Sequence, residues 1–209
     1  MKTWIKISGV LLLLLFFVTG SSAVEKQETW EEVNTRATGL YKEQHFIKAG
    51  RVARYAVELA RKLPAEEREK LAISLGNLSM IATHLGNFGE AENAAKEELE
   101  IREQLHGKEN VEPLKAWNHL AIIYTMAQKP DDAEFCLERI ISICEQLYGA
   151  QSSEVLAALY KLEKFYKISK NKEKEKKTAA RIATLESVLD KERQDSKEPV
   201  NKEEVKQGS

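Results

Sequence analysis

Apolar residues recur at helical spacing through the centre of the chain. They fall three or four residues apart over residues 114–124, and the same spacing returns over residues 135–147. Between the two stretches, Pro130 suits the first turn of a helix, and Asp131 and Asp132 suit its positive end. The pattern therefore predicts a helical hairpin.

This hairpin pattern recurs at a fixed step of 42 residues. At this step Ala133 falls on Ala91 and Ala49, and Gly149 falls on Gly107. The step defines four units, residues 30–71, 72–113, 114–155 and 156–193. A fixed period in this range is typical of a solenoid. We therefore expect an all-α solenoid of about four antiparallel helix pairs, in which no unit is stable alone.

The residues at the repeat positions resemble those of the tetratricopeptide repeats. The third unit carries the family pattern in Trp117, Leu120, Ala121, Tyr124, Ala133 and Leu137. The second unit has the family-like turn Gly86-Asn-Phe88-Gly-Glu-Ala91. The 42-residue period is similar to the longer variant in kinesin light chains. The resemblance implies a non-catalytic scaffold that binds a protein or peptide partner in a concave groove, without a cofactor.

The fourth unit departs from the family pattern and suits a terminal cap. Glu163 stands at a position that favours a small residue, and Glu175 replaces an alanine. The stretch 161–181 carries nine basic and three acidic side chains. A basic run of this kind is typical of a solvated capping face, although it could also contact anionic lipid or an acidic partner.

A second stripe lies opposite the core face of each first helix, at 100° per residue. Its candidate groove residues are Asn34, Tyr41, Asn77, Met80, Thr83, His84, Lys115, Asn118, Ile122 and Met126. A merely solvated face would not carry Met80, Ile122 and Met126, whereas a peptide groove combines apolar floors with a few polar groups. Alternatively, these apolar residues pack against the first helix of the next unit.

The N-terminal residues have the layout of a secretory signal peptide, with two lysines, an apolar run and a small-residue site. We expect cleavage after Ala23, leaving a short lead over residues 24–29. The apolar run covers 12 residues, 7–18, whereas a spanning helix needs about 20. The mature protein is therefore expected to be exported, periplasmic or secreted, without a stable membrane span. The alternative is an uncleaved segment that anchors the protein in the membrane.

The bulk composition allows one domain with a substantial core. The chain has 209 residues, of which 43% are hydrophobic and 31% charged. Its net charge is −1, and removal of Lys2 and Lys6 with the signal peptide makes it −3. Nothing in this balance indicates a nucleic-acid surface. Residues 194–209 are charged and lack a periodic apolar face, which predicts a disordered tail.

The sequence carries no pattern typical of catalysis or metal binding. Its four histidines form no spaced ligand pair, and it has neither a Gly-rich phosphate loop nor a nucleophile elbow. Cys136 and Cys144 are eight residues apart, so one helix separates them by about 12 Å, too far for a disulfide. We expect two small buried side chains, a protein that is not an enzyme, and no metal site. A self-associating structural envelope protein and an exported enzyme with an unrecognised site are the alternatives, and the oligomeric state is open.

Overall fold

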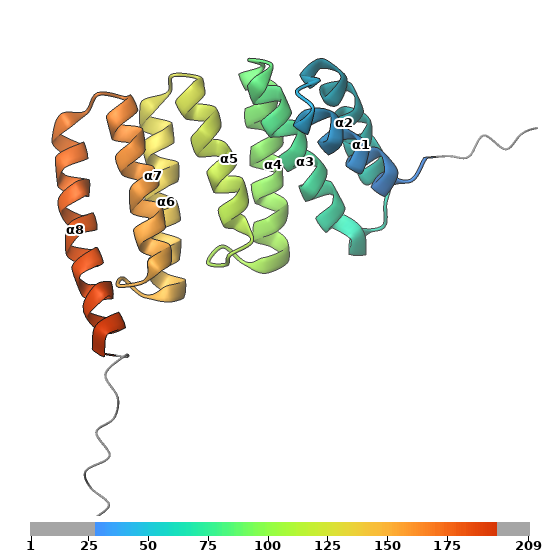
Figure 1. The fold of residues 1–209 in the computed structure, drawn as a ribbon. Coiled ribbons are helices and arrows are strands. Elements are labelled where there is room, and N and C mark those ends of the chain that lie inside the picture. Colours follow the sequence, from blue (N-terminus) through green and yellow to red (C-terminus); the bar gives the residue numbers. More distant parts are fainter. Residues whose placement is uncertain (1–27, 196–209) are drawn as a thin grey trace, which may run out of the picture.

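The computed structural model describes residues 28–195, and these form a row of four antiparallel helix pairs (Figure 1). The elements are α1 (Trp30–Lys42), α2 (Phe46–Ala60), the 3-10 turn η1 (Ala65–Glu67), α3 (Arg68–His84), α4 (Phe88–His106), α5 (Pro113–Met126), α6 (Pro130–Tyr148), α7 (Ser153–Ile168) and α8 (Lys172–Asp195). The expected all-α solenoid is confirmed. The signal segment 1–23 and most of the expected tail lie outside the described residues, while α8 continues two residues into that tail.

Each helix pair turns at the same repeat position, through one residue with left-handed backbone. These residues are Gln44, Gly86, Gln128 and Lys170, and their φ angles lie between 57° and 73°. Each follows the previous one by a single repeat period along the sequence. Glycine adopts this conformation at little cost, whereas a residue with a Cβ atom is strained there. The turn geometry is therefore imposed by the packing of the two helices, and in three units it overrides the preference of the residue.

Local sequence signals set several helix ends. Thr29 caps α1 in a reciprocal arrangement with Glu32, in which each side chain accepts from the other residue's backbone N–H. Pro113 and Pro130 open α5 and α6, where a missing N–H is tolerated. The position that the sequence assigned to Pro130, Asp131 and Asp132 is confirmed, since all three lie in the first turn of α6.

The core runs between successive helices as two large adjoining clusters, with a third, small one of Val33, Ala56 and Leu59 between α1 and α2. The first joins α1 to α4 through residues such as Ala53, Leu75 and Ile101, and the second joins α3 to α8 through residues such as Ile123 and Leu159. Both large clusters include side chains from the second unit, so neighbouring units share their apolar faces. This is the packing of a solenoid, in which each unit buries its neighbour.

Some apolar repeat positions lie at the edge of this core. Leu105 and Leu147 occupy the last turns of α4 and α6 and are exposed, as is Phe135 near the start of α6. Helical spacing places these residues on the apolar face of their helices, but it does not show that they remain exposed.

The two cysteines are buried as free thiols on α6, which confirms the expectation. Burial raises the pKa of the Cys136 thiol to about 12, so it stays protonated. Across residues 28–195, the helices are either too short or too polar to span a bilayer.

Candidate peptide-binding groove

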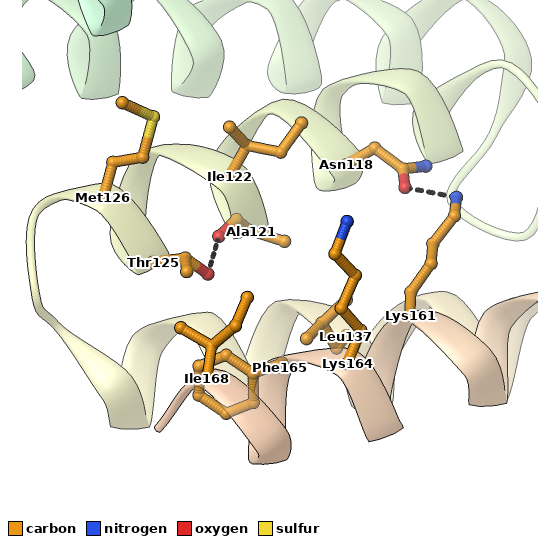
Figure 2. Close-up of a pocket in the computed structure, with 10 residues that line it drawn as sticks. All are labelled: Asn118, Ala121, Ile122, Thr125, Met126, Leu137, Lys161, Lys164, Phe165 and Ile168. Carbon is orange, nitrogen blue, oxygen red and sulfur yellow. Dashed lines mark hydrogen bonds between the residues drawn. The ribbon is translucent and has the colours of Figure 1, made fainter. Parts of the chain in front are cut away.

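An open groove lies between α5 and α7, the first helices of the third and fourth units (Figure 2). Its volume is about 380 Å³. The residues that line it are Asn118, Ala121, Ile122, Thr125, Met126, Leu137, Lys161, Lys164, Phe165 and Ile168. Side chains from the two helices face each other across the opening, so the groove needs both units.

The groove has a buried apolar floor and an exposed apolar rim. Ala121, Leu137 and Phe165 are buried and belong to the larger core cluster. Along the rim, Ile122 is 41% exposed, Met126 47% and Ile168 60%. Exposed apolar side chains that adjoin one another are typical of interaction sites on soluble proteins.

Polar groups gather at the end of the groove opposite Met126 (Figure 2). The Asn118 amide donates to the backbone oxygen of Leu114 at 2.6 Å, and its Oδ1 accepts from Lys161 Nζ at 2.7 Å. Lys164 lies beside them, and no carboxylate from residues 28–195 lines the groove. Elsewhere in the described chain carboxylates neutralise many lysines, for example Lys96 and Lys129 at Glu92.

The groove opens where two first helices do not pack directly. α3 packs against α5 and, less extensively, against α1, whereas α5 and α7 are joined mainly through α6. Lys161 bridges the α5–α7 gap with its long side chain. The apolar side chains on either side of the gap are therefore left uncovered.

At the first junction, where the first and second units meet, the contact that corresponds to Asn118–Lys161 joins two side-chain amides. Asn77 Nδ2 of α3 donates to Asn34 Oδ1 of α1 at 2.9 Å. Nearer the turn, Tyr41 and His84 form a 2.8 Å hydrogen bond, and Phe46 stacks on the His84 ring. In the first two units, the predicted groove residues therefore bond to one another in two pairs, Asn34 with Asn77 and Tyr41 with His84.

The middle junction replaces this contact with a buried carboxylate. Glu98 of α4 is 1% exposed, and its Oε2 lies 2.7 Å from His119 Nδ1 of α5. Its Oε1 accepts from Arg102 Nε at 3.0 Å. The carboxylate fills the space beside Gly76, where a Cβ atom would lie only 2.8 Å from Glu98 Oε1.

Arg102 extends this cluster toward both neighbouring first helices. Its Nη1 lies 2.7 Å from Glu69 of α3 and 3.0 Å from Glu112, which precedes α5. His106 also contacts Glu69, at 3.1 Å. The charged groups at this junction thus contact one another, and His119 belongs to this cluster rather than to the groove.

The ten candidate residues from the sequence divide into three groups. Asn118, Ile122 and Met126 line the groove. The prediction was wrong for Thr83, which is buried instead of facing a groove. Its hydroxyl donates to the Ser79 carbonyl of its own helix. The remaining six lie away from this groove: Asn34, Tyr41, Asn77, Met80, His84 and Lys115. Among these, exposed Lys115 contacts Glu112 at 2.7 Å.

Five lining residues lie on α6 and α7, and none is among the ten candidates, although the repeat places Lys164 on the second stripe of the fourth unit. Ile168 and Lys161 lie one period after Met126 and His119, so the 42-residue step could have found them. Leu137 and Phe165 could not be found in this way, because they occupy core positions and reach the groove only where the helices separate.

The described residues contain no group of three or more His, Cys, Asp or Glu side chains arranged to hold a metal ion. The groove supplies apolar contact, two ammonium groups and an amide, which suits binding of a chain segment.

Comparisons with known proteins relate the repeats to a family. The tetratricopeptide repeat model matches residues 71–112 and 114–154. A search of curated protein sequences found no match. Among solved structures, BtubC (BKLC) from P. vanneervenii is 21% identical with a TM-score of 0.65, and the alignment covers 77% of this chain and 64% of BtubC. The present chain thus spans less than two thirds of that protein.

Two structures of a putative kinesin light chain from Podosopora anserina, with nearly identical TPR-like repeats, are also similar. A form with a single substitution gives a TM-score of 0.68 over 78% of this chain, and the other form gives 0.67 over 77%. Both are 15% identical to this chain, and 76% of each is covered. At this identity the likeness concerns the fold.

Proposed function

Because the central units of this chain are tetratricopeptide repeats, we propose that the protein is an exported, non-catalytic scaffold that binds a protein or peptide partner in the groove between α5 and α7. The observation that carries this proposal is the exposed apolar rim. Ile122, Met126 and Ile168 adjoin one another on a surface that other parts of the described chain leave uncovered. Burying them against a partner would remove apolar area from water and so favour binding.

Export is supported by the sequence of residues 1–23. A basic start, a short apolar run and a small-residue site are the features that a secretory signal requires. N-terminal sequencing of the exported protein tests this part of the proposal, and we expect a mature chain that begins at Val24. Recovery of intact Met1 in a membrane pellet would support the anchored alternative instead.

Partner binding is tested with the double change Asn118→Ala and Met126→Glu. The first change removes the acceptor for Lys161, and the second places a charge on the apolar rim. We expect crosslinking capture from the native envelope fraction, read by mass spectrometry, to lose the partner obtained with the unchanged protein. Both positions lie on the surface of α5, so helicity and thermal melting should remain nearly unchanged.

A matched control puts the same kinds of change on α4, away from the groove. Asn93→Ala with Leu105→Glu alters an exposed amide and an exposed leucine. Capture should survive in this variant. Unfolding of the groove variant would mean that the stripe belongs to the core, and equal capture by both variants would contradict the groove assignment.

A further inference from the structure

Lysines surround the turn between α7 and α8, and we call residues 167–177 the basic turn. This stretch carries six lysines and two glutamates. Lys174 contacts Glu134 of α6, and Lys172 lies 3.5 Å from Glu175. The other four are exposed and form no ion pair with the described residues: Lys167, Lys170, Lys176 and Lys177. Their positive charge is therefore available to a partner.

The basic turn contrasts in charge with the part of the chain that precedes the last unit's lysines. Residues 28–160 carry 22 acidic and 15 basic side chains. Positive charge is thus concentrated at one place on a protein whose other described units are acidic on balance. A concentration of one sign of charge attracts surfaces of the opposite sign.

Exposed aliphatic side chains accompany lysines at both ends of one edge of the array. The four helix-pair turns lie along this edge, at the top of Figure 1. At the last turn Ile168 is 60% exposed and follows Lys167, and at the first turn Ile47 is 71% exposed and precedes the exposed Lys48. A membrane interface favours this combination, because head groups attract the ammonium groups and the acyl boundary accepts the aliphatic ones.

We propose that this edge binds the surface of an anionic phospholipid bilayer. The lysines of the basic turn contact lipid phosphates, and Ile47 and Ile168 enter the boundary between head groups and acyl chains. Membrane binding at this edge is separate from partner binding in the groove and goes beyond it.

The residue types in the basic turn favour a bilayer over an acidic protein. All six cations are lysines, whereas arginine is the residue suited to fixed, forked recognition of carboxylates and phosphates. Lysine is depleted from protein–protein interfaces. Four of the ammonium groups are not held by any described carboxylate, which suits a fluid layer of head groups that rearranges around them.

Sedimentation with lipid vesicles tests the proposal. The mature chain from Val24 is mixed with vesicles of phosphatidylcholine alone, or of phosphatidylcholine with phosphatidylglycerol. We expect it to sediment with the anionic vesicles only. Raising the salt from about 0.1 M to 1 M shortens the Debye length from about 10 Å to 3 Å and should release it.

Neutralising two unpaired lysines locates the binding surface. Lys167→Gln with Lys170→Gln should weaken the vesicle partition coefficient roughly 30-fold, as expected for two lysines near an anionic surface. Glutamine is tolerated at position 170, because Gln44 and Gln128 adopt the same left-handed conformation at the equivalent turns.

The matched charge control lies at the opposite edge of the array. Lys62→Gln with Lys108→Gln removes two exposed lysines from the loops that join successive units (Figure 1). Vesicle partition should stay within about twofold of the unchanged protein, because these lysines face away from the bilayer. Thermal melting verifies that both lysine variants are folded.

A second pair of variants tests the aliphatic contact without touching the groove. Ile47→Glu should weaken partition about tenfold or more, since it removes an inserting side chain and adds a negative charge. Val111→Glu alters a residue that is 47% exposed in the loop before α5, at the opposite edge, and should leave partition nearly unchanged.

Each contrary outcome would overturn the proposal. Failure of the unchanged chain to prefer anionic vesicles would exclude the bilayer as its partner. Equal losses in the two lysine variants would mean that overall charge, and not this edge, drives binding. Binding to poly-glutamate as tight as to anionic vesicles, measured by fluorescence anisotropy, would identify an acidic polypeptide as the occupant instead.

Discussion

Gly76 shows how one residue decides the chemistry of a junction. Its missing side chain leaves room for the Glu98 carboxylate, which reaches from α4 to meet His119 of α5. Burying a carboxylate is costly unless charged and hydrogen-bonded partners surround it. Here Arg102 and His119 contact its two oxygens, so the glycine and the cluster depend on each other.

Gly76→Ala should therefore destabilise the protein. Alanine normally favours a helix over glycine by about 1 kcal/mol. At this site, however, the new Cβ atom would lie 2.8 Å from Glu98 Oε1, and the overpacking should cost about 1–3 kcal/mol. Urea unfolding monitored by circular dichroism measures the change.

Gly39 on α1 provides the matched control, because a Cβ atom there would meet nothing in the described chain within 4 Å. Gly39→Ala should raise the free energy of unfolding by roughly 0.5–1 kcal/mol. If both alanine variants are stabilised, the close approach of Glu98 to Gly76 is not present in solution.

Trp117 makes its contribution through ring contact rather than hydrogen bonding. It is partly buried against the larger core cluster, meets Phe135 edge-on at 5.9 Å, and its indole N–H has no acceptor among the described residues. Trp117→Ala should cost about 3 kcal/mol, the lower limit for truncating a large aromatic in a core. Trp117→Phe should cost less than about 1 kcal/mol, because it keeps ring contact and removes an unpaired donor.

Thermal and denaturant melts of both Trp117 variants measure these costs. Equal losses for alanine and phenylalanine would show that the indole N–H is satisfied in solution. A loss near zero for both would place the side chain outside the core.

At the level of helices, the last two junctions share a tyrosine–glutamate contact. Tyr124 of α5 donates to Glu92 of α4 at 3.2 Å, and Tyr166 of α7 donates to Glu134 of α6 at 2.7 Å. Desolvation raises the pKa of Tyr124 to about 12, so the phenol remains a donor. The first junction instead packs Gly50 closely against Leu85 and joins Arg54 to Glu90 with two 2.6 Å hydrogen bonds.

This junction chemistry predicts an acid-sensitive contribution to stability. Lys96, followed by Lys129, lowers the pKa of the Glu92 carboxyl to about 2. A carboxyl with a lowered folded-state pKa stabilises the fold above its unfolded pKa, about 4.3, and loses this contribution as the pH falls. Glu92→Gln should thus lower the melting temperature at pH 7, and the difference from the unchanged protein should close between about pH 5 and pH 2.

Glu66→Gln serves as the control for this titration, because Glu66 is exposed on the turn η1. It should change the melting temperature little at any pH. A difference for Glu92→Gln that persists at pH 2 would show that the carboxylate charge does not supply the contribution.

The helix pairs could be read from the sequence because core spacing and turn residues repeat together. The groove could be predicted only in part, because the second stripe of the first helices has different surroundings at each junction. Thr83 and Thr125 are equivalent in sequence, yet Thr83 is buried on α3, which packs against α5, whereas Thr125 lines the groove between α5 and α7. The distance between successive first helices depends on side chains of the second helix between them, such as Glu98. The repeat period of the sequence does not reveal this distance.

Across the whole molecule, the two adjoining core clusters divide the array into halves that meet in the second unit. Leu75 belongs to the cluster of the first two units, and Leu159 belongs to the cluster that extends to α8. Repeat arrays are stabilised by nearest-neighbour interfaces, so damage in one half should be felt mainly there.

Hydrogen exchange can detect this division. Leu159→Ala, which truncates a fully buried side chain, should cost about 2–5 kcal/mol and speed exchange most in α5 to α8. Leu75→Ala should have the complementary effect in α1 to α4. A uniform increase along the described chain in either variant would mean that the array unfolds as one cooperative block.

The contacts at the three junctions also imply that the units are not interchangeable parts. Asn34 meets Asn77, Glu98 meets His119 beside Gly76, and Asn118 meets Lys161. A unit moved elsewhere in the array would face a neighbour with the wrong side chains. A copy of the second and third units inserted after the third would create one new junction, Asn118 against Asn77, which repeats the existing amide pair. The same insertion would put Glu138 of α6 where Arg54 stands at the first junction, against Glu90, so duplication of two units would also require compensating changes on the second helices.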